Sequence, residues 1–401
     1  MKIIFLNPTA FLGGAEMCLL DLLATLGPGV TPKVILMDDG PLKQAVEALG
    51  VACGVLPLPD RLAGLGDAGM GWSPGRKSRL RLAANAPGAA VAGLGYLRLL
   101  RRRLREEAPG LVQTNGMKAH VLGAWAAPKG VPVVWHLHDY LSGRAVMGRL
   151  LRASLRDGLK VVAVSRSVAI DAANVLGTRI RIFTILNAVD LERFSPGPGD
   201  GTRLDAEAGL PLAPEGTVRV GLVATYARWK GHAVFLDAIA KVPRDRRSRF
   251  YIMGGPLYRS SGSQWSIEEL RSHAENLGVG DRIGFVPHRA DPESLYRALD
   301  VVVHTSTRPE PFGRVIVEAM ACGKAVVAVP LGGASELFTD EVSAIACPAG
   351  DAAGLAETLT RLIDEPDLRI RLGEAGRREA MERFDRARLT GEWERVYRAA
   401  N

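Results

Sequence analysis

The segment 299–329 constrains the fold most, because it alternates apolar runs with an amphipathic helical pattern. Residues 299–304 predict a buried strand, and 325–329 predict a second one. Between them lie a polar turn over 305–310, then Pro311, which suits the first turn of a helix, and apolar residues at helical spacing. Two strands joined by a helix in this way predict neighbouring parallel strands of one sheet.

Two carboxylates on this unit suggest a binding site. Glu310 lies in the loop at the positive end of the predicted helix, and Glu318 lies about 9 Å further along the helix axis. The N–H groups around Gly313 could hold a diphosphate, with Glu318 accepting hydrogen bonds from a ribose and Glu310 near the sugar. Alternatively, Glu310 only complements the helix dipole and Glu318 only pairs with Arg314 at i, i+4. The residue types alone leave both interpretations open.

A longer pattern adds to this. The run Glu-Pro-Phe-Gly-(x4)-Glu-Ala-Met-Ala-Cys-Gly that begins at Glu310, together with the later Pro-Leu-Gly-Gly-Ala-Ser-Glu, resembles the signature of retaining glycosyltransferase family 4 (glycosyl transferases group 1). The resemblance implies that Glu318 binds the ribose hydroxyls of a nucleotide-sugar donor, and that Glu310 lies beside the transferred sugar as a catalytic residue. It also implies that the helix start holds the donor diphosphate. The donor-binding positions there are Pro311, Phe312, Gly313 and Arg314.

Two other junctions fit the donor side. Arg228 and Lys230 follow a predicted strand over 218–223, where two cations suit a diphosphate, although a solvated loop would look the same. Lys230 matches the Lys-Gly of the family pattern. Thr225 stands where the family has arginine, so the sequence leaves open whether Arg228 replaces that charge. Gly254 follows the next strand, where the family's nucleotide approaches the backbone.

The first loop contains a glycine pair. Gly13 and Gly14 lie at a strand–helix junction, where they could admit a phosphate or only make a tight turn. With Glu16 they resemble the family's first loop, which faces the donor diphosphate and the acceptor. The resemblance therefore assigns the two glycines to donor binding and Glu16 to the acceptor side.

Two histidines end a predicted strand over 131–140. His136 and His138 point the same way and, with Asp139, could bind a metal, but no third close ligand is evident. A buried histidine bonded to backbone is the simpler interpretation. The family carries a histidine at this strand end, near the transferred sugar. His138 matches it better and is predicted to be catalytic, and His136 is the second choice, on the acceptor side.

Charge is unevenly distributed, since residues 1–195 hold 24 Lys and Arg against 14 Asp and Glu. This excess of positive charge suits an anionic membrane, a phosphorylated lipid or an acidic glycan as a partner. A base composition of the gene that favours arginine codons gives the same count without any partner.

Residues 60–88, with Arg76 and Arg79, are predicted to form an irregular loop that faces the acceptor or a membrane. The helix predicted over 94–107 should pack its leucines on the sheet, in preference to lying on a membrane. No basic–aromatic pattern indicates nucleic-acid binding.

Four cysteines without metal-ligand spacing, no signal-peptide pattern and no membrane-spanning apolar run predict a cytoplasmic protein, with peripheral attachment to the inner face of the membrane left open. The predicted class is α/β with the GT-B architecture, in which two Rossmann-like domains face each other across a cleft. The predicted parts are an acceptor-binding domain over 1–195, a linker over 196–217, a nucleotide-sugar domain over 218–385, and a helix over 386–401 that crosses back to the first domain.

The predicted function is retaining transfer of a sugar from a UDP- or GDP-type donor to an acceptor hydroxyl, in synthesis of a bacterial surface glycan, a glycolipid or a glycosylated metabolite. No cofactor and no metal are expected, since no Asp-x-Asp motif is evident. Two alternatives remain, a sugar-nucleotide epimerase of the same architecture and a non-catalytic nucleotide-sugar-binding subunit. The base, the sugar, the acceptor, the linkage and the oligomeric state are not readable from the sequence.

Overall fold

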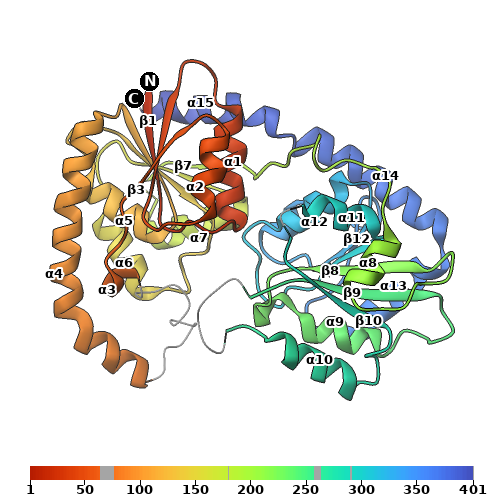
Figure 1. Cartoon of the computed structure of the whole chain (residues 1–401). Coiled ribbons are helices and arrows are strands. Elements are labelled where there is room, and N and C mark those ends of the chain that lie inside the picture. Colours follow the sequence, from red (N-terminus) through yellow and green to blue (C-terminus); the bar gives the residue numbers. More distant parts are fainter. Residues whose placement is uncertain (64–75, 179, 257–262, 290, 401) are drawn as a thin grey trace. The chain divides into compact units, whose positions relative to one another are not determined.

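The chain folds into two compact units. The computed structural model describes residues 1–63, 76–178, 180–256, 263–289 and 291–400, with the backbone alone at 63, 76–87, 89 and 90. Unit 1 comprises Met1–Ala188 and Arg386–Asn401, and unit 2 comprises Val189–Asp385. Each unit has its own parallel sheet with helices on both faces (Figure 1). The predicted α/β class with two Rossmann-like domains is confirmed.

Unit 1 is built on a seven-stranded sheet in which all neighbouring strands are parallel. In spatial order the strands are β3 (Ala52–Val55), β2 (Thr31–Leu36), β1 (Lys2–Asn7), β4 (Leu111–Asn115), β5 (Val133–Leu137), β6 (Lys160–Ala163) and β7 (Ile182–Thr184). The strand order reverses between β1 and β4. Open α/β sheets bind ligands at the carboxyl ends of the strands on either side of such a reversal.

The described helices of unit 1 come from both ends of the chain. They are α1 (Gly14–Thr25), α2 (Pro41–Ala48), α3 (Asp60–Ala63), α4 (Arg76–Glu107), α5 (Met117–Ala126), α6 (Ala145–Ala153), α7 (Arg166–Leu176) and α15 (Leu389–Ala400). Helix α15 belongs to this unit because Leu389, Trp393, Val396 and Tyr397, at helical spacing, are buried against the sheet. Tyr397 also donates from its hydroxyl to Gln113 Oε1 at 2.8 Å.

Unit 2 has a six-stranded parallel sheet with the same reversal between its two central strands. Its order is β10 (Ile283–Pro287), β9 (Ser248–Gly254), β8 (Val218–Val223), β11 (Val301–His304), β12 (Ala325–Ala328) and β13 (Ile345–Ala346). The α-helices are α8 (Gly201–Glu207), α9 (His232–Ile239), α10 (Ile267–Asn276), α11 (Pro292–Ala298), α12 (Arg314–Ala321), α13 (Ala352–Asp364) and α14 (Pro366–Arg383). The short 3₁₀ turns of the chain are η1 (Arg228–Lys230), η2 (Gly333–Glu336) and η3 (Arg386–Arg388).

The two units divide after Ala188, and the segment 196–217, which was predicted to be a linker, lies within unit 2. This segment contains helix α8, whose Asp205 is fully buried in unit 2. Asp205 accepts hydrogen bonds from the Tyr251 hydroxyl and from Arg219 at 2.9 Å. The Pro-Gly run at 196–199 suggested a flexible connection. The residues after this run are instead held in place by the buried carboxylate of Asp205.

Two other local predictions are corrected. Residues 76–88 are not an irregular loop, because α4 begins at Arg76; alanine-rich sequence forms helix without a strong apolar period. Helix α12 begins at Arg314 and not near Pro311. Gly313 precedes it with φ 105°, a left-handed conformation that glycine adopts at little cost.

Candidate functional site

The centre of the candidate site is the carboxylate of Glu310, which is 7% exposed in the loop between β11 and α12. The Glu310 backbone is fixed, since its N–H donates to the Leu331 carbonyl at 3.1 Å and its carbonyl accepts from the Gly333 N–H at 2.7 Å. Lys230 Nζ donates to both carboxylate oxygens, at 2.9 Å to Oε1 and 2.7 Å to Oε2. The loops after two neighbouring strands, β8 and β11, therefore meet in a largely buried ion pair.

Two further donors reach Oε2 of Glu310. They are Ser306 Oγ at 2.9 Å and His304 Nε2 at 3.3 Å. Burial by itself raises the pKa of Glu310, but the charge of Lys230 and the hydrogen bond from His304 outweigh it and lower that pKa far below its usual range. Glu310 is therefore an ionised carboxylate at neutral pH.

A tight turn places Lys230 beside this carboxylate. Gly231 follows it with φ 78°, and a Cβ at that position would overlap the backbone carbonyl of Thr305. Thr305 Oγ1 donates to the carbonyls of Lys230 at 3.0 Å and Gly231 at 3.2 Å. Glycine is required here because the two loops approach too closely for any side chain.

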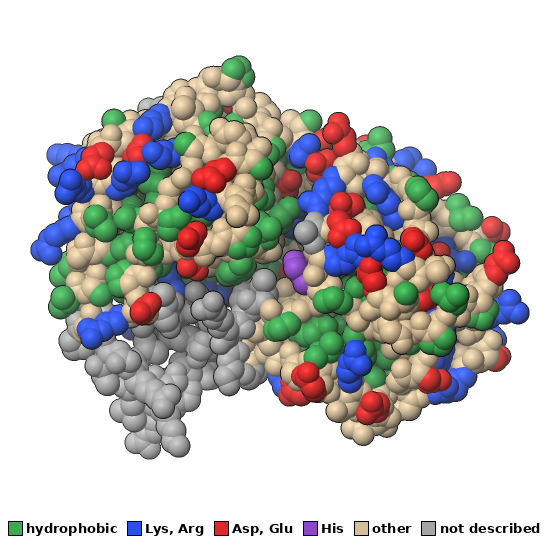
Figure 2. Space-filling view, viewed as in Figure 1, with side chains coloured by type: hydrophobic (Ala, Val, Ile, Leu, Met, Phe, Trp, Pro, Cys, Tyr) green, Lys and Arg blue, Asp and Glu red, His purple; other side chains and the backbone are tan. Residues whose placement is uncertain are grey.

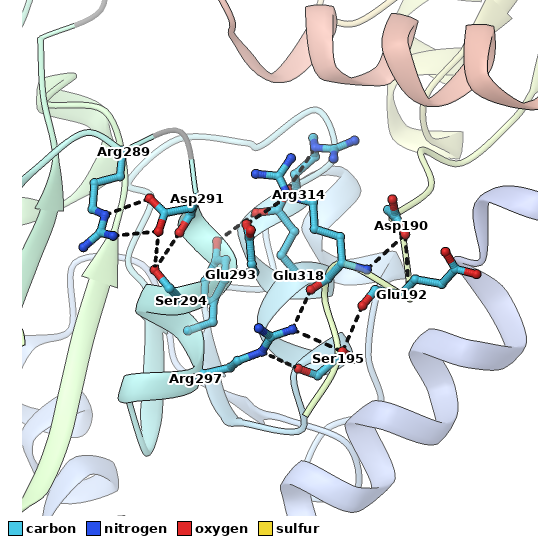
Figure 3. Close-up of polar contacts among 12 residues, drawn as sticks. Asp190, Glu192, Ser195, Arg289, Asp291, Glu293, Ser294, Arg297, Arg314 and Glu318 are labelled. Carbon is cyan, nitrogen blue, oxygen red and sulfur yellow. Dashed lines mark hydrogen bonds and ion pairs between the residues drawn. The ribbon is translucent and has the colours of Figure 1, made fainter. Parts of the chain in front are cut away.

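Glu318 lies on α12 and is buried between two partners. Arg314 Nε donates to its Oε1 at 3.1 Å, and the Tyr296 hydroxyl donates to its Oε2 at 2.8 Å. Figure 3 shows the pair of Arg314 and Glu318, and also Arg297, which donates to the backbone carbonyl of Ser195 at 2.9 Å. The i, i+4 pairing considered from sequence thus exists. It does not by itself exclude binding of a ribose, because each carboxylate oxygen can accept more than one hydrogen bond.

The start of α12 carries no side-chain cap. The N–H groups of a helix start leave a partial positive charge that favours anions. The Phe312 side chain is buried, with its ring 6.0 Å from that of Phe384. Pro311 is partly buried in the same loop. The structure thus places Gly313 at the helix start, whereas Phe312 packs into the core.

The side chains of Arg228 and Lys230 contact different residues. Its guanidinium pairs with Glu269 at 2.6 Å and stacks over the Trp265 ring at 3.9 Å from the ring centroid. The role expected for it as a diphosphate clamp stays a prediction. Gly254, at the end of β9, has φ 148°, and a Cβ there would overlap the Ala224 carbonyl.

In unit 1 the predicted residues lie at the carboxyl ends of β1 and β5. Glu16, in the first turn of α1, is buried and accepts hydrogen bonds from Thr9 Oγ1 and from Asn7 Nδ2 at 3.3 Å. Gly13 is the residue before α1, and a Cβ on it would lie 2.8 Å from Glu16 Oε2. Gly14 is exposed at the first position of the helix.

His136 and His138 lie together, with ring centroids 4.0 Å apart. His136 is buried and its ring meets Trp393 edge-on at 4.8 Å. Burial lowers the pKa of His136 well below its usual value, and the nearby His138 lowers it further. His136 is thus a neutral core residue. Among the described residues, no group of three or more His, Cys, Asp and Glu side chains could hold a metal ion.

Sequence reasoning missed four polar residues of these sites. His304 and Ser306 were predicted only as parts of a buried strand and a polar turn, and no role was predicted for Tyr296 or Asn115. Position was the available signal for three of them, since His304 and Asn115 end a strand and Ser306 follows one, whereas Tyr296 lies within α11. The side chains of Arg76 and Arg79, predicted on the acceptor side, lie outside the described residues.

Comparisons with known proteins agree along the chain. Residues 12–193 match the family model of Glycosyltransferase Family 4, and residues 211–379 match that of Glycosyl transferases group 1. The D-inositol 3-phosphate glycosyltransferase of Xylanimonas cellulosilytica is 33% identical over 281 residues, which are 68% of this chain and 62% of that protein. The protein of the same name from Saccharomonospora viridis is 37% identical over 227 residues, 54% of this chain and 50% of that one. Both matches span less than two thirds of the relatives' own length.

Solved structures match over the full length. Anabaena HepE in complex with UDP and glucose is 27% identical and covers 99% of each chain, with a TM-score of 0.78. HepE in complex with UDP-glucose is also 27% identical, covers 100% of each chain and has a TM-score of 0.79. WaaG, a glycosyltransferase of lipopolysaccharide biosynthesis, is 16% identical with a TM-score of 0.69, which shows a shared fold.

Proposed function

The chain belongs to glycosyltransferase family 4 and has the GT-B architecture, and on this premise we propose that it transfers a sugar from a nucleoside-diphosphate donor to an acceptor hydroxyl with retention of the anomeric configuration. The observation that carries the proposal is the buried pair of Lys230 and Glu310 at the carboxyl ends of β8 and β11, beside the uncapped start of α12. This arrangement offers an ammonium and helix amides to a diphosphate, and an ionised carboxylate to a sugar.

The roles follow from the chemistry. The bond from the anomeric carbon to the phosphate oxygen breaks, and the diphosphate leaves with the electron pair, stabilised by Lys230 and the helix start at Gly313. The charge that develops on the sugar ring is stabilised by Glu310. The acceptor oxygen bonds to the anomeric carbon on the same face, and its proton passes to the departing phosphate. Glu318 accepts hydrogen bonds from the ribose, and the catalytic role predicted for His138 stays a prediction.

The donor proposed first is a UDP-sugar. Support comes from HepE, which is similar over its whole length and was solved with UDP, with UDP-glucose, and with UDP and glucose. Inositol 3-phosphate is the first acceptor to test, because the curated relatives carry it in their name. A bacterial glycan or glycolipid is the second acceptor to test. We also propose that catalysis needs no metal.

The test is turnover of UDP-glucose by the full chain in EDTA, with inositol 3-phosphate and simple sugars offered as acceptors. We expect release of UDP that depends on the acceptor, and a product whose anomeric proton coupling in the NMR spectrum matches that of the donor. A product of inverted configuration would contradict retention. Conversion of the donor to another sugar without any acceptor would favour the epimerase alternative. Activity restored only by a divalent ion would contradict metal independence.

We also propose peripheral contact with an anionic membrane through α4. The leucines that were predicted to pack inward, Leu97, Leu100 and Leu104, are buried. On its other side Arg98, Arg102 and Arg105 are exposed, and the exposed hydrophobic residues Leu94 and Leu99 lie among them. Figure 2 shows basic side chains beside hydrophobic ones on this part of unit 1. In the described part of the chain, no helix is long and apolar enough to span a bilayer.

Cosedimentation with vesicles tests the contact. Vesicles with anionic lipid should bind the protein at low salt and release it at high salt, because the attraction is electrostatic and is screened. Equal binding to neutral vesicles, or none to either kind, would contradict the proposal.

A further inference from the structure

The tripeptide His304-Thr305-Ser306, where β11 ends, fixes both members of the central ion pair. Side chains two residues apart in an extended chain point the same way. His304 and Ser306 accordingly both reach Glu310, and they lie 3.0 Å from each other, Nε2 to Oγ. Thr305, between them, instead bonds the carbonyls of the turn that carries Lys230.

The hydrogen positions follow from the partners. A carboxylate only accepts hydrogen bonds, so the His304 nitrogen that faces Glu310 carries a hydrogen, and the Ser306 hydroxyl directs its own hydrogen to Oε2. His304 is 4% exposed and Ser306 is 1% exposed. Bulk water therefore cannot replace either donor.

The proposed donor makes a competing demand on Lys230. In the structure its ammonium lies within hydrogen-bond distance of both oxygens of Glu310. A diphosphate carries more negative charge than one carboxylate and attracts the same ammonium. When Lys230 turns toward the diphosphate, the Glu310 carboxylate loses donors and needs others to keep its place.

We propose that His304 and Ser306 are positioning residues, which hold the Glu310 carboxylate beside the transferred sugar while the Lys230 ammonium binds the donor diphosphate. This inference rests on the proposed function and goes beyond it, because neither residue touches the donor and both act through Glu310. It separates two kinetic effects. Loss of His304 or Ser306 should lower kcat and leave the donor KM nearly unchanged, whereas loss of Lys230 should weaken donor binding itself.

The experiment compares Ser306→Ala with Ser343→Ala, a matched control. Ser343 is also 1% exposed and also donates to a glutamate, Glu379, which lies on α14 outside the site. The readouts are UDP release from UDP-glucose by the full chain and the affinity for UDP by calorimetry. We expect Ser306→Ala to lower kcat on the order of 10-fold, with KM and UDP affinity within about twofold, because a hydrogen bond to a charged group is lost. Ser343→Ala should leave kcat within about twofold.

His304 is tested by rescue. His304→Ala should lower kcat at least as much as Ser306→Ala, and His304→Gln, whose amide can still donate, should recover most of the loss. If His304→Ala does not fold, Ser306→Ala and His304→Gln still decide the matter.

Three results separate this inference from its premise. A wild-type protein that turns over UDP-glucose, with Ser306→Ala and His304→Ala no slower than Ser343→Ala, would overturn the positioning role alone. So would variants that raise the donor KM and leave kcat unchanged. A wild-type protein that neither binds UDP nor releases it from UDP-glucose would overturn the proposed donor, and this inference with it.

Discussion

The two units differ at the same topological place, the carboxyl ends of their central strands. In unit 2 the polar side chains there include a buried ion pair, Lys230 with Glu310, and the helix that follows carries a second, Arg314 with Glu318. In unit 1 the buried carboxylate of Glu16 lies among neutral groups. Asn7 Oδ1, both amide atoms of Asn115 and both ring nitrogens of His136 are buried without a hydrogen-bond partner among the described residues.

These side chains determine what each sheet can offer a ligand. Paired charges can exchange partners with an anion such as a diphosphate, at little desolvation cost, because the site is already polar and preorganised. Unpartnered neutral groups cost free energy when buried and gain it back from any hydroxyl or amide that reaches them. The contrast suits the charged diphosphate of a donor on unit 2 and the hydroxyl groups of a ligand on unit 1.

The largest effect should come from breaking the central pair. Lys230→Ala leaves Glu310 buried without that counter-charge, so the free energy of unfolding should fall by about 3 kcal/mol. UDP binding should be lost as well. Urea denaturation followed by circular dichroism measures the first effect and calorimetry the second.

The double variant Lys230→Met with Glu310→Gln is the control for the central pair, because it removes both charges. It should recover most of the stability without recovering activity. If Lys230→Ala were as stable as the wild type, the pair would not be the buried, coupled interaction that the structure shows.

The next effect concerns the neutral histidines of unit 1. Burial, with a smaller contribution from His138, lowers the pKa of His120 to about 3, and it also lowers that of His136. The unfolded chain protonates these rings near pH 6.5 and the folded one does not. Their contribution to stability is therefore complete above pH 6.5 and falls as the pH drops toward their folded pKa values, by about 1.4 kcal/mol per pH unit for each.

Comparing unfolding free energies at pH 7 and pH 5 tests this. Between pH 7 and pH 5 the unfolding free energy of His136→Leu should fall by about 2 kcal/mol less than that of the wild type, because the variant lacks one titrating ring. The same change at the exposed His288 is the control. An identical pH dependence in His136→Leu and the wild type would show that this ring does not stay neutral in the fold.

A smaller effect is expected at Glu318. Glu318→Gln keeps the shape of the side chain and removes the charge that would accept the ribose hydroxyls, so UDP affinity should fall about 10-fold. Glu379→Gln removes the charge from another i, i+4 pair with arginine and should leave affinity unchanged. Equal affinities in all three proteins would leave Glu318 with only a structural role.

The smallest effect is expected at Asn115, which is 1% exposed. Asn115→Leu removes two buried polar atoms that have no partner in the described structure, and should change the unfolding free energy by no more than about 1 kcal/mol, in the stabilising direction. Acceptor-dependent turnover should fall if this end of the sheet binds the acceptor. A large loss of stability would mean that Asn115 is a satisfied part of the core.

The sequence was most informative where periodicity and spacing agree. The strands and the two glutamates of the 299–329 unit could be predicted because apolar runs, a glycine and a long motif point to the same structure. Helix α14 could not be predicted, because many of its 18 residues are charged and few apolar residues recur at helical spacing. The partners of Arg228 could not be predicted either, since Glu269 lies 41 residues away and only the fold brings the two together.

We propose above all that the strand ends of unit 2 bind a nucleoside diphosphate. Thermal unfolding of the wild type and of Lys230→Ala with UDP, GDP and ADP, in EDTA, tests this binding. A ligand at a hundred times its Kd adds about 2.7 kcal/mol of stability. We predict this shift with UDP in the wild type and its loss in the variant. No shift with any nucleotide at millimolar concentration, or an equal shift in both proteins, would contradict the claim.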